Sequence, residues 1–166
     1  APNGAPAIND LNLDVDVGIT FGVLGPNGSG KTTLVNILAT LTRYDSGIMR
    51  IAGLDPEKQG NDVRRSVGVV THEPLLYEHL SGYENLRFHA RLFGLDDVDV
   101  RISRASERMG MAGRVHQRVA TLSHGLQKRL SIARALLHDP ALLLMDEPES
   151  GLDQEALTLL EGVVHE

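Results

Sequence analysis

The segment Gly25-Pro26-Asn27-Gly28-Ser29-Gly30-Lys31-Thr32 decides how the rest of the chain is interpreted. It fits the G-x-x-x-x-G-K-[ST] pattern, in which glycines let the backbone curl until its N–H groups point inward around a phosphate. Lys31 is expected to reach the β- and γ-phosphates of a nucleotide, and Thr32 to offer its hydroxyl to Mg²⁺. A helix that opens at about Gly30 would direct the positive end of its dipole at the same charge. The segment therefore predicts a phosphate site.

The residues around this loop give the order of strand, loop and helix that the pattern requires. Residues 19–24 are a short apolar run, and residues 11–17 alternate apolar and polar side chains before Gly18, so two strands are expected ahead of the loop. A helix is expected behind it, because apolar residues recur there at helical spacing: Leu34, Ile37, Leu38 and Leu41. The alternative is a glycine-rich turn that matches by chance, which this context disfavours.

The composition of the 166 residues is that of one globular domain. The 22 acidic residues outnumber the 16 Lys and Arg residues and give a net charge of −6, which disfavours a broad basic surface for nucleic acid but leaves a local patch open. There is no cysteine, so disulfides and Cys-based metal sites are excluded. No apolar run has the length of a membrane span, and residues 1–4 lack the features of a signal peptide, so a soluble chain is expected.

Further strands and helices are expected to complete an α/β fold. Residues 48–52 and 67–71 are predicted strands. The segment Ser81-Gly82-Tyr83-Glu84 has the form of a capping box, which predicts a helix that Gly94 ends, and a second helix is predicted over residues 97–109. This helical part is either a surface for a partner or a solvated helical excursion without one.

A second functional segment is Ala141-Leu142-Leu143-Leu144-Met145-Asp146-Glu147-Pro148. An apolar run that leads into two carboxylates predicts a fully buried parallel strand, and the carboxyl ends of such strands form the edge where open α/β sheets bind ligands. Asp146 is placed to hold Mg²⁺ opposite Thr32, and Glu147 to polarise the water that attacks the γ-phosphate. The alternative is a strand that simply ends in a charged turn.

Between these segments lies Leu122-Ser123-His124-Gly125-Leu126-Gln127-Lys128-Arg129, followed by apolar residues on one helical face. Here the chain resembles the ATP-binding-cassette (ABC) ATPases, whose signature loop is Leu-Ser-Gly-Gly-Gln followed by a helix. Leu122, Ser123 and Gly125 match that loop, whereas His124 and Leu126 differ. The resemblance implies that Ser123 and Gly125 contact the γ-phosphate held by the other subunit of a head-to-tail dimer. Residues 150–153 resemble the D-loop of the family, which couples the two sites of the dimer.

The resemblance covers essentially the whole chain and implies a P-loop NTPase fold: a RecA-like, mostly parallel sheet with a small antiparallel β part and a helical insertion. The N-terminal strands and phosphate-loop core are expected at residues 1–80, the helical subdomain at 81–125, and the signature helix, Walker B strand and D-loop helix at 126–166. The implied ligands are ATP and Mg²⁺, with Thr32 and Asp146 on the metal. The residues expected on the nucleotide are Gly25, Pro26, Asn27, Gly28, Ser29, Gly30, Lys31, Thr32, Thr33, Ser123 and Gly125, and those expected in catalysis are Glu147, Lys31 and His72.

The chain departs from the family in two ways. Where the family has the Gln of the Q-loop, which contacts Mg²⁺ and the attacking water, this chain has His72. A neutral imidazole can form hydrogen bonds in the same role, or else His72 is only a loop residue. The family also has an adenine-stacking aromatic residue before this region and a switch His after it, so C-terminal truncation and poor hydrolysis by the chain alone are expected. His165 follows Asp153 too closely to be that switch His.

The resemblance implies an ATP-binding and ATP-hydrolysing subunit of a membrane transporter on the cytoplasmic face of the cell membrane. The implied partners are a second ATPase subunit and a transmembrane permease, with no nucleic acid. Residues 72–77 and 83–86 resemble the exporter branch, in particular the ATPase of cytochrome c biogenesis haem exporters, where a His also stands at the Q-loop. The alternatives are a soluble ABC protein that acts on the ribosome or DNA, and a sensor that binds ATP without hydrolysis, which Glu147 disfavours.

Overall fold

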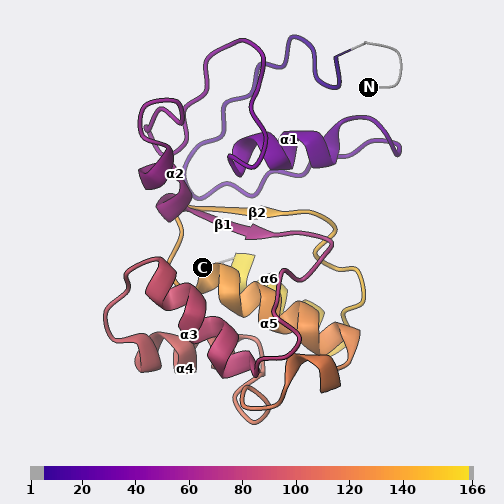
Figure 1. Ribbon diagram of the computed structural model, residues 1–166. Helices are drawn as coiled ribbons and strands as arrows, with labels where there is room; N and C mark the ends of the chain where they lie inside the picture. Colours follow the sequence, from indigo (N-terminus) through magenta and orange to yellow (C-terminus); the bar gives the residue numbers. More distant parts are fainter. Residues whose placement is uncertain (1–5, 165–166) are drawn as a thin grey trace.

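A parallel pair of strands divides the chain into two layers (Figure 1). The computed structural model describes residues 6–164. On one side of the strands lie the N-terminal segment and α1, and on the other side lie α3, α4, α5 and α6. The helices of the described residues are α1 (Lys31–Leu38), α2 (Gly60–Ser66), α3 (Gly82–Leu92), α4 (Val98–Arg108), the 3₁₀ turn η1 (Val119–Thr121), α5 (His124–Leu136) and α6 (Gln154–Val164), and the strands are β1 (Val67–Val70) and β2 (Leu142–Met145).

The register of the two strands brings two loops to the same edge of the sheet. Val70, the last residue of β1, pairs with Met145, the last residue of β2. The backbone N–H of Asp146 then donates to the carbonyl of Val70 at 2.9 Å. The loop that begins at Thr71 and the carboxylates that follow β2 therefore leave the sheet side by side, as expected for the carboxyl ends of parallel strands.

The hydrophobic core has one part on each face of the strands. The larger part lies between β1 and the α3–α6 layer and includes the apolar side chains of the second half of α5, where every residue from Lys128 to Leu136 is buried. Gly68 of β1 allows this packing, because a Cβ atom there would lie 2.6 Å from the carbonyl oxygen of Ala135 on α5. The smaller part lies on the side of α1 and α2, around Val63, Val67 and Leu144.

Three predicted strands are wrong. Residues 11–17 and 19–24 form no strand, and near residues 48–52 there is a single antiparallel bridge between Ile51 and Leu54. Alternating side chains define a face, but a strand also needs a neighbouring backbone to satisfy its N–H and C=O groups, and no segment within residues 6–164 pairs with these. The apolar side chains of residues 11–24 are consequently exposed, Val17 and Leu24 almost fully, whereas Ile51 is buried.

The predicted helices are confirmed with small changes. The Ser81 side chain accepts from the Glu84 N–H and the Glu84 carboxylate accepts from the Ser81 N–H, which is the expected capping box at the start of α3. Helix α4 spans most of the predicted residues 97–109. Helix α1 ends before Leu41, because Thr40 takes a left-handed conformation with φ 57°, and Leu41 is exposed. Helix α2 was not predicted, and of the β2 residues, expected to be fully buried, only Leu144 is buried.

Candidate functional site

The phosphate loop has the backbone geometry that its glycines predict. Gly28 and Gly30 have φ of 82° and 95°, in the left-handed region that favours glycine, and a Cβ atom at Gly25 would lie 2.8 Å from Ser29 Oγ. Gly30 is the N-cap of α1, and no side chain caps the helix. The first N–H groups of a helix have no acceptor within it, so the backbone from Lys31 to Thr33 can bind an anion. The loop therefore fits a phosphate group.

Lys31 lies folded over the loop. Its ammonium donates to the carbonyl oxygens of Gly25 at 2.7 Å and Pro26 at 2.9 Å. An ammonium has three donors, so one stays available for a phosphate oxygen. These two contacts hold the positive charge above the loop whose N–H groups would bind the same anion.

Thr32 and Asp146 meet although they are 114 residues apart in the chain. The Thr32 hydroxyl donates to the Asp146 carboxylate at 2.9 Å. Thr32 lies in the first turn of α1 and Asp146 directly follows β2, so this contact joins the phosphate loop to the carboxyl edge of the sheet. A hydroxyl and a carboxylate oxygen are the hard ligands that Mg²⁺ prefers, and Mg²⁺ sites commonly combine one or two such groups with substrate phosphates.

Glu147 and His72 face each other across the same edge. Their Oε2 and Nδ1 atoms are 3.9 Å apart, and both side chains are exposed, at 61% and 68%. Glu147 also has a positive φ of 47°, a sparsely populated conformation for a residue other than glycine. The structure thus brings together Lys31, Thr32, Asp146, Glu147 and His72 around one exposed edge.

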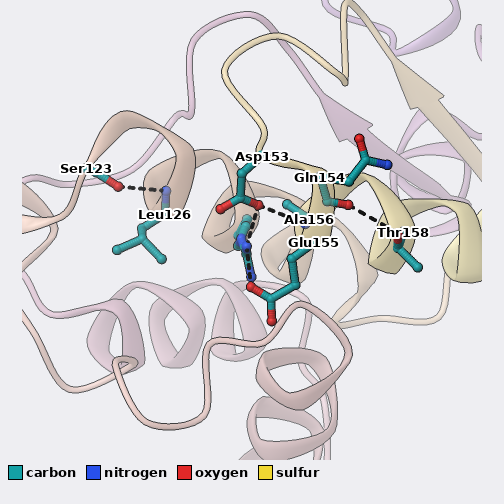
Figure 2. A network of polar contacts seen from close by, with 8 residues as sticks. Ser123, Leu126, Asp153, Gln154, Glu155, Ala156 and Thr158 are labelled. Carbon is teal, nitrogen blue, oxygen red and sulfur yellow. Dashed lines mark hydrogen bonds and ion pairs between the residues drawn. The ribbon is translucent and has the colours of Figure 1, made fainter.

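Ser123 and Gly125 lie elsewhere, at the N-terminus of α5. The Ser123 hydroxyl accepts from the Leu126 N–H at 3.4 Å (Figure 2). A Cβ atom at Gly125 would lie 2.8 Å from the Gly151 carbonyl oxygen, and one at Gly151 would lie 2.6 Å from His124 Nδ1. The start of α5 is therefore in close contact with the loop at residues 150–153, and within residues 6–164 it makes no hydrogen bond to the phosphate loop.

Asp153 connects the loop at residues 150–153 to both α5 and α6 by hydrogen bonds and an ion pair. Its carboxylate accepts from the Ala156 N–H at 2.9 Å, and its ion pair with the buried Arg129 measures 2.6 Å. Glu155 lies 3.0 Å from the same guanidinium group, and Figure 2 shows both carboxylates pointing toward this contact. The Ala156 N–H and the Arg129 guanidinium lower the pKa of Asp153.

We expect Asp153→Asn to lower the Tm at pH 7 by a few degrees, because the amide can still accept from Ala156 but cannot pair with Arg129. Since the pKa of Asp153 is lower in the folded state than in the unfolded state, its contribution is present above about pH 4 and is lost as the pH falls further. Thermal melts of both forms from pH 7 to pH 3 should therefore converge. Asp45→Asn, at an exposed aspartate, is the control, and a pH-independent difference would contradict this assignment.

Two buried cations near the site were missed by the sequence analysis. Lys128 donates to the Thr71 carbonyl at 3.0 Å, and Arg134 donates to the Val69 and Leu75 carbonyls at 2.9 and 3.3 Å. Burial lowers the pKa of Lys128, although the carboxylates of Asp146, Glu149 and Glu147 raise it in part. Burial also lowers the pKa of Arg134, to about 10. Their burial has no signal in the sequence, because α5 also carries Gln127, Arg129 and Ser131. His165, rejected above as a switch His, lies outside the described residues, as do residues 1–4.

A scan against protein-family models matches residues 8–150 to the ABC transporter family. The chain belongs to this family. It is similar to the ABC transporter ATP-binding protein NatA of Bacillus subtilis (39% identity, covering 89% of this chain and 61% of NatA). It is also similar to the Nod factor export ATP-binding protein I of Cupriavidus metallidurans (40%, covering 92% and 51%) and to the doxorubicin resistance ATP-binding protein DrrA of Mycobacterium tuberculosis (42%, covering 89% and 45%). The chain thus spans about half the length of the curated relatives it matches.

Two solved structures share the fold. One is cbiO1 from Clostridium perfringens, part of the ABC transporter complex cbiONQ, with a TM-score of 0.83 and 28% identity, covering 95% of this chain and 67% of that one. The other is an ATP-binding cassette solved as a dimer in a post-hydrolysis state bound to ADP and Pi, with a TM-score of 0.83 and 26% identity, covering 95% and 75%. The α/β P-loop NTPase fold is thereby confirmed. None of the helices within residues 6–164 is long and apolar enough to cross a membrane.

Proposed function

We propose that this chain is part of an ATP-binding and ATP-hydrolysing subunit of an ABC transporter. The observation that carries the proposal is the Thr32–Asp146 hydrogen bond, because it joins the phosphate loop to the carboxylates after β2. Those two segments are the parts that nucleotide hydrolysis requires: one binds the phosphates, and the other holds the metal and orients water.

The residues of the site have different roles in binding and hydrolysing ATP. The loop N–H groups and Lys31 bind the phosphates, while Thr32 and Asp146 are the groups that would hold Mg²⁺. Mg²⁺ supplies charge neutralisation on the phosphate oxygens. Glu147 would accept a hydrogen bond from the attacking water and take up its proton. His72, 3.9 Å from Glu147, would help to orient the same water.

A second subunit would complete the site. Ser123 and Gly125 lie at the helix N-terminus of α5, away from their own phosphate loop, and a helix N-terminus favours a phosphate. In a head-to-tail dimer they would contact the γ-phosphate bound by the partner. The dimeric, ADP-bound cassette supports this arrangement, and cbiO1, part of a transporter complex, supports a permease as a further partner. The proposed location is the cytoplasmic face of the cell membrane.

Export is the proposed direction of transport. Its support is the similarity to a Nod factor export protein and to a doxorubicin resistance protein. A haem substrate in cytochrome c maturation rests on the resemblance of residues 72–77 and 83–86, including His72, and the relatives named above carry other names, so it stays a prediction. ATP turnover by the complete natural protein, measured as phosphate release with and without Mg²⁺ and with its permease in lipid vesicles, tests the proposal. Turnover that does not depend on Mg²⁺ would contradict the proposed site, and Mg²⁺-dependent turnover that the permease does not change would favour the soluble alternative.

His72 is expected to affect coupling more than nucleotide binding, because it reaches the site only beside Glu147, on the loop that leads to α3. His72→Gln should keep most of the ATPase activity, since an amide also donates and accepts hydrogen bonds. His72→Ala should lower the stimulation of ATP turnover by the permease several-fold. The measurement is turnover in the reconstituted transporter, with His79→Ala, at an exposed histidine of the same loop, as the control. If the Gln and Ala variants showed the same ATP turnover and the same stimulation by the permease, His72 would have no role in coupling.

A further inference from the structure

Lys128 is a lysine buried beneath the sheet edge that carries the candidate catalytic residues. It extends from α5 and is only 1% exposed. Its ammonium donates to the carbonyl oxygen of Thr71 at 3.0 Å, and within residues 6–164 this is its one hydrogen bond. A lysine is rarely fully buried unless it is paired, because burial of an isolated ammonium is costly. Burial of the Lys128 ammonium is therefore expected to serve a structural or functional role that compensates for its cost.

Three carboxylates near the sheet edge partly offset the effect of burial on the pKa of this ammonium. They belong to Asp146, Glu149 and Glu147, in decreasing order of their effect on Lys128. None of them forms a direct ion pair with Lys128 in the described part of the chain. The Lys128 ammonium therefore acts on Asp146 and Glu147 as a nearby buried charge and not as a direct ion-pair partner.

The peptide that Lys128 holds is the first one of the His72 loop. Thr71 directly follows β1, whose last carbonyl, that of Val70, accepts from the Asp146 N–H. Arg134, also on α5, donates to the carbonyl of Leu75 in the same loop. The loop that carries His72 is therefore held from below by two buried cations of one helix, and that helix begins beside Ser123.

We propose that Lys128 is a positioning residue for ATP hydrolysis, which fixes the Thr71 peptide so that His72 faces Glu147 and places a buried positive charge beneath Asp146 and Glu147. This inference rests on the proposed ATPase function. Because Lys128 acts on the groups that orient water and not on the phosphate loop, its loss should slow the chemical step without weakening ATP binding. A misplacement of about 1 Å in such groups can cost up to about 100-fold in rate.

The test compares Lys128→Met and Lys128→Arg in the complete natural protein, with Lys58→Met as the control at an exposed lysine. We expect Lys128→Met to lower kcat for ATP about tenfold or more and to change KM less than about twofold. Its Tm should be unchanged or higher, because an apolar side chain of similar length that replaces a buried charge is often neutral or stabilising. Lys128→Arg keeps the charge and the donors and should restore most of kcat, and Lys58→Met should match the wild type.

Two results would overturn the inference and leave the ATPase proposal intact. In one, Lys128→Met hydrolyses ATP with the wild-type kcat. In the other, its kcat and Tm fall together and Lys128→Arg rescues neither, which would make Lys128 purely structural. A wild-type protein that does not hydrolyse ATP would overturn the ATPase proposal itself, and this inference with it.

Discussion

Lys31→Ala is expected to abolish nucleotide binding at concentrations where the wild-type protein is saturated. The Lys31 ammonium is held over the loop by the Gly25 and Pro26 carbonyls, and its remaining donor can bind the γ-phosphate. Since a hydrogen bond to a charged group contributes about 1.5–3 kcal/mol, we expect the affinity for the nucleotide to fall by about 10- to 150-fold. Titration calorimetry with a non-hydrolysable ATP analogue measures this directly.

The control for this experiment is Lys58→Ala, because the Lys58 side chain is 79% exposed and lies away from the loop, next to Asp55. It should bind the analogue as the wild type does. If Lys31→Ala bound with unchanged affinity, the assignment of residues 25–32 as the phosphate site would be wrong, whatever the effect on turnover.

Glu147→Gln in the complete natural protein is expected to bind ATP but to stop hydrolysing it. The amide keeps the shape of the carboxylate but cannot take up a proton from water, and loss of a general base typically lowers kcat by about 10²–10⁴-fold. Because bound ATP is not hydrolysed, it should hold two subunits together as a dimer. The measurements are phosphate release and an ATP-dependent dimer peak in size-exclusion chromatography.

Glu161→Gln, at an exposed position of α6, is the matched control and should keep wild-type turnover. A Glu147→Gln variant that hydrolyses ATP at the wild-type rate would show that another group is the base. Loss of binding together with turnover would instead place Glu147 among the groups that bind the nucleotide.

The local features of this chain could be predicted from its sequence. The glycine spacing indicated a loop with positive φ and a helix that begins after Gly30, and both are found. The capping box at Ser81 marked the start of α3. The meeting of Thr32 with Asp146 also followed, because carboxyl ends of parallel strands share an edge with the loop before α1. Each of these features depends on residues close in sequence or on one general rule of sheet topology.

The features that the sequence did not predict correctly, strand pairing and the burial of two cations, depend on contacts between segments far apart in the chain. Residues 11–17 alternate as a strand does and residues 19–24 form an apolar run, but hydrogen-bonded pairing needs a partner strand that these patterns do not identify. Lys128 and Arg134 have side chains that are usually exposed to solvent, so their residue types do not predict that they are buried. Only the packing of α5 against β1 turns these two residues into donors to the His72 loop.

The close approach of the α5 N-terminus to the loop at residues 150–153 couples the side chains that two positions can hold. His124 stands where the family signature has a glycine, and its ring fills the space that a side chain at position 151 would occupy. An alanine at position 151 would meet the His124 ring in addition to the unfavourable φ of 78°. The residue tolerated at one position therefore depends on the residue at the other, so His124 and Gly151 form an epistatic pair at the start of the signature helix.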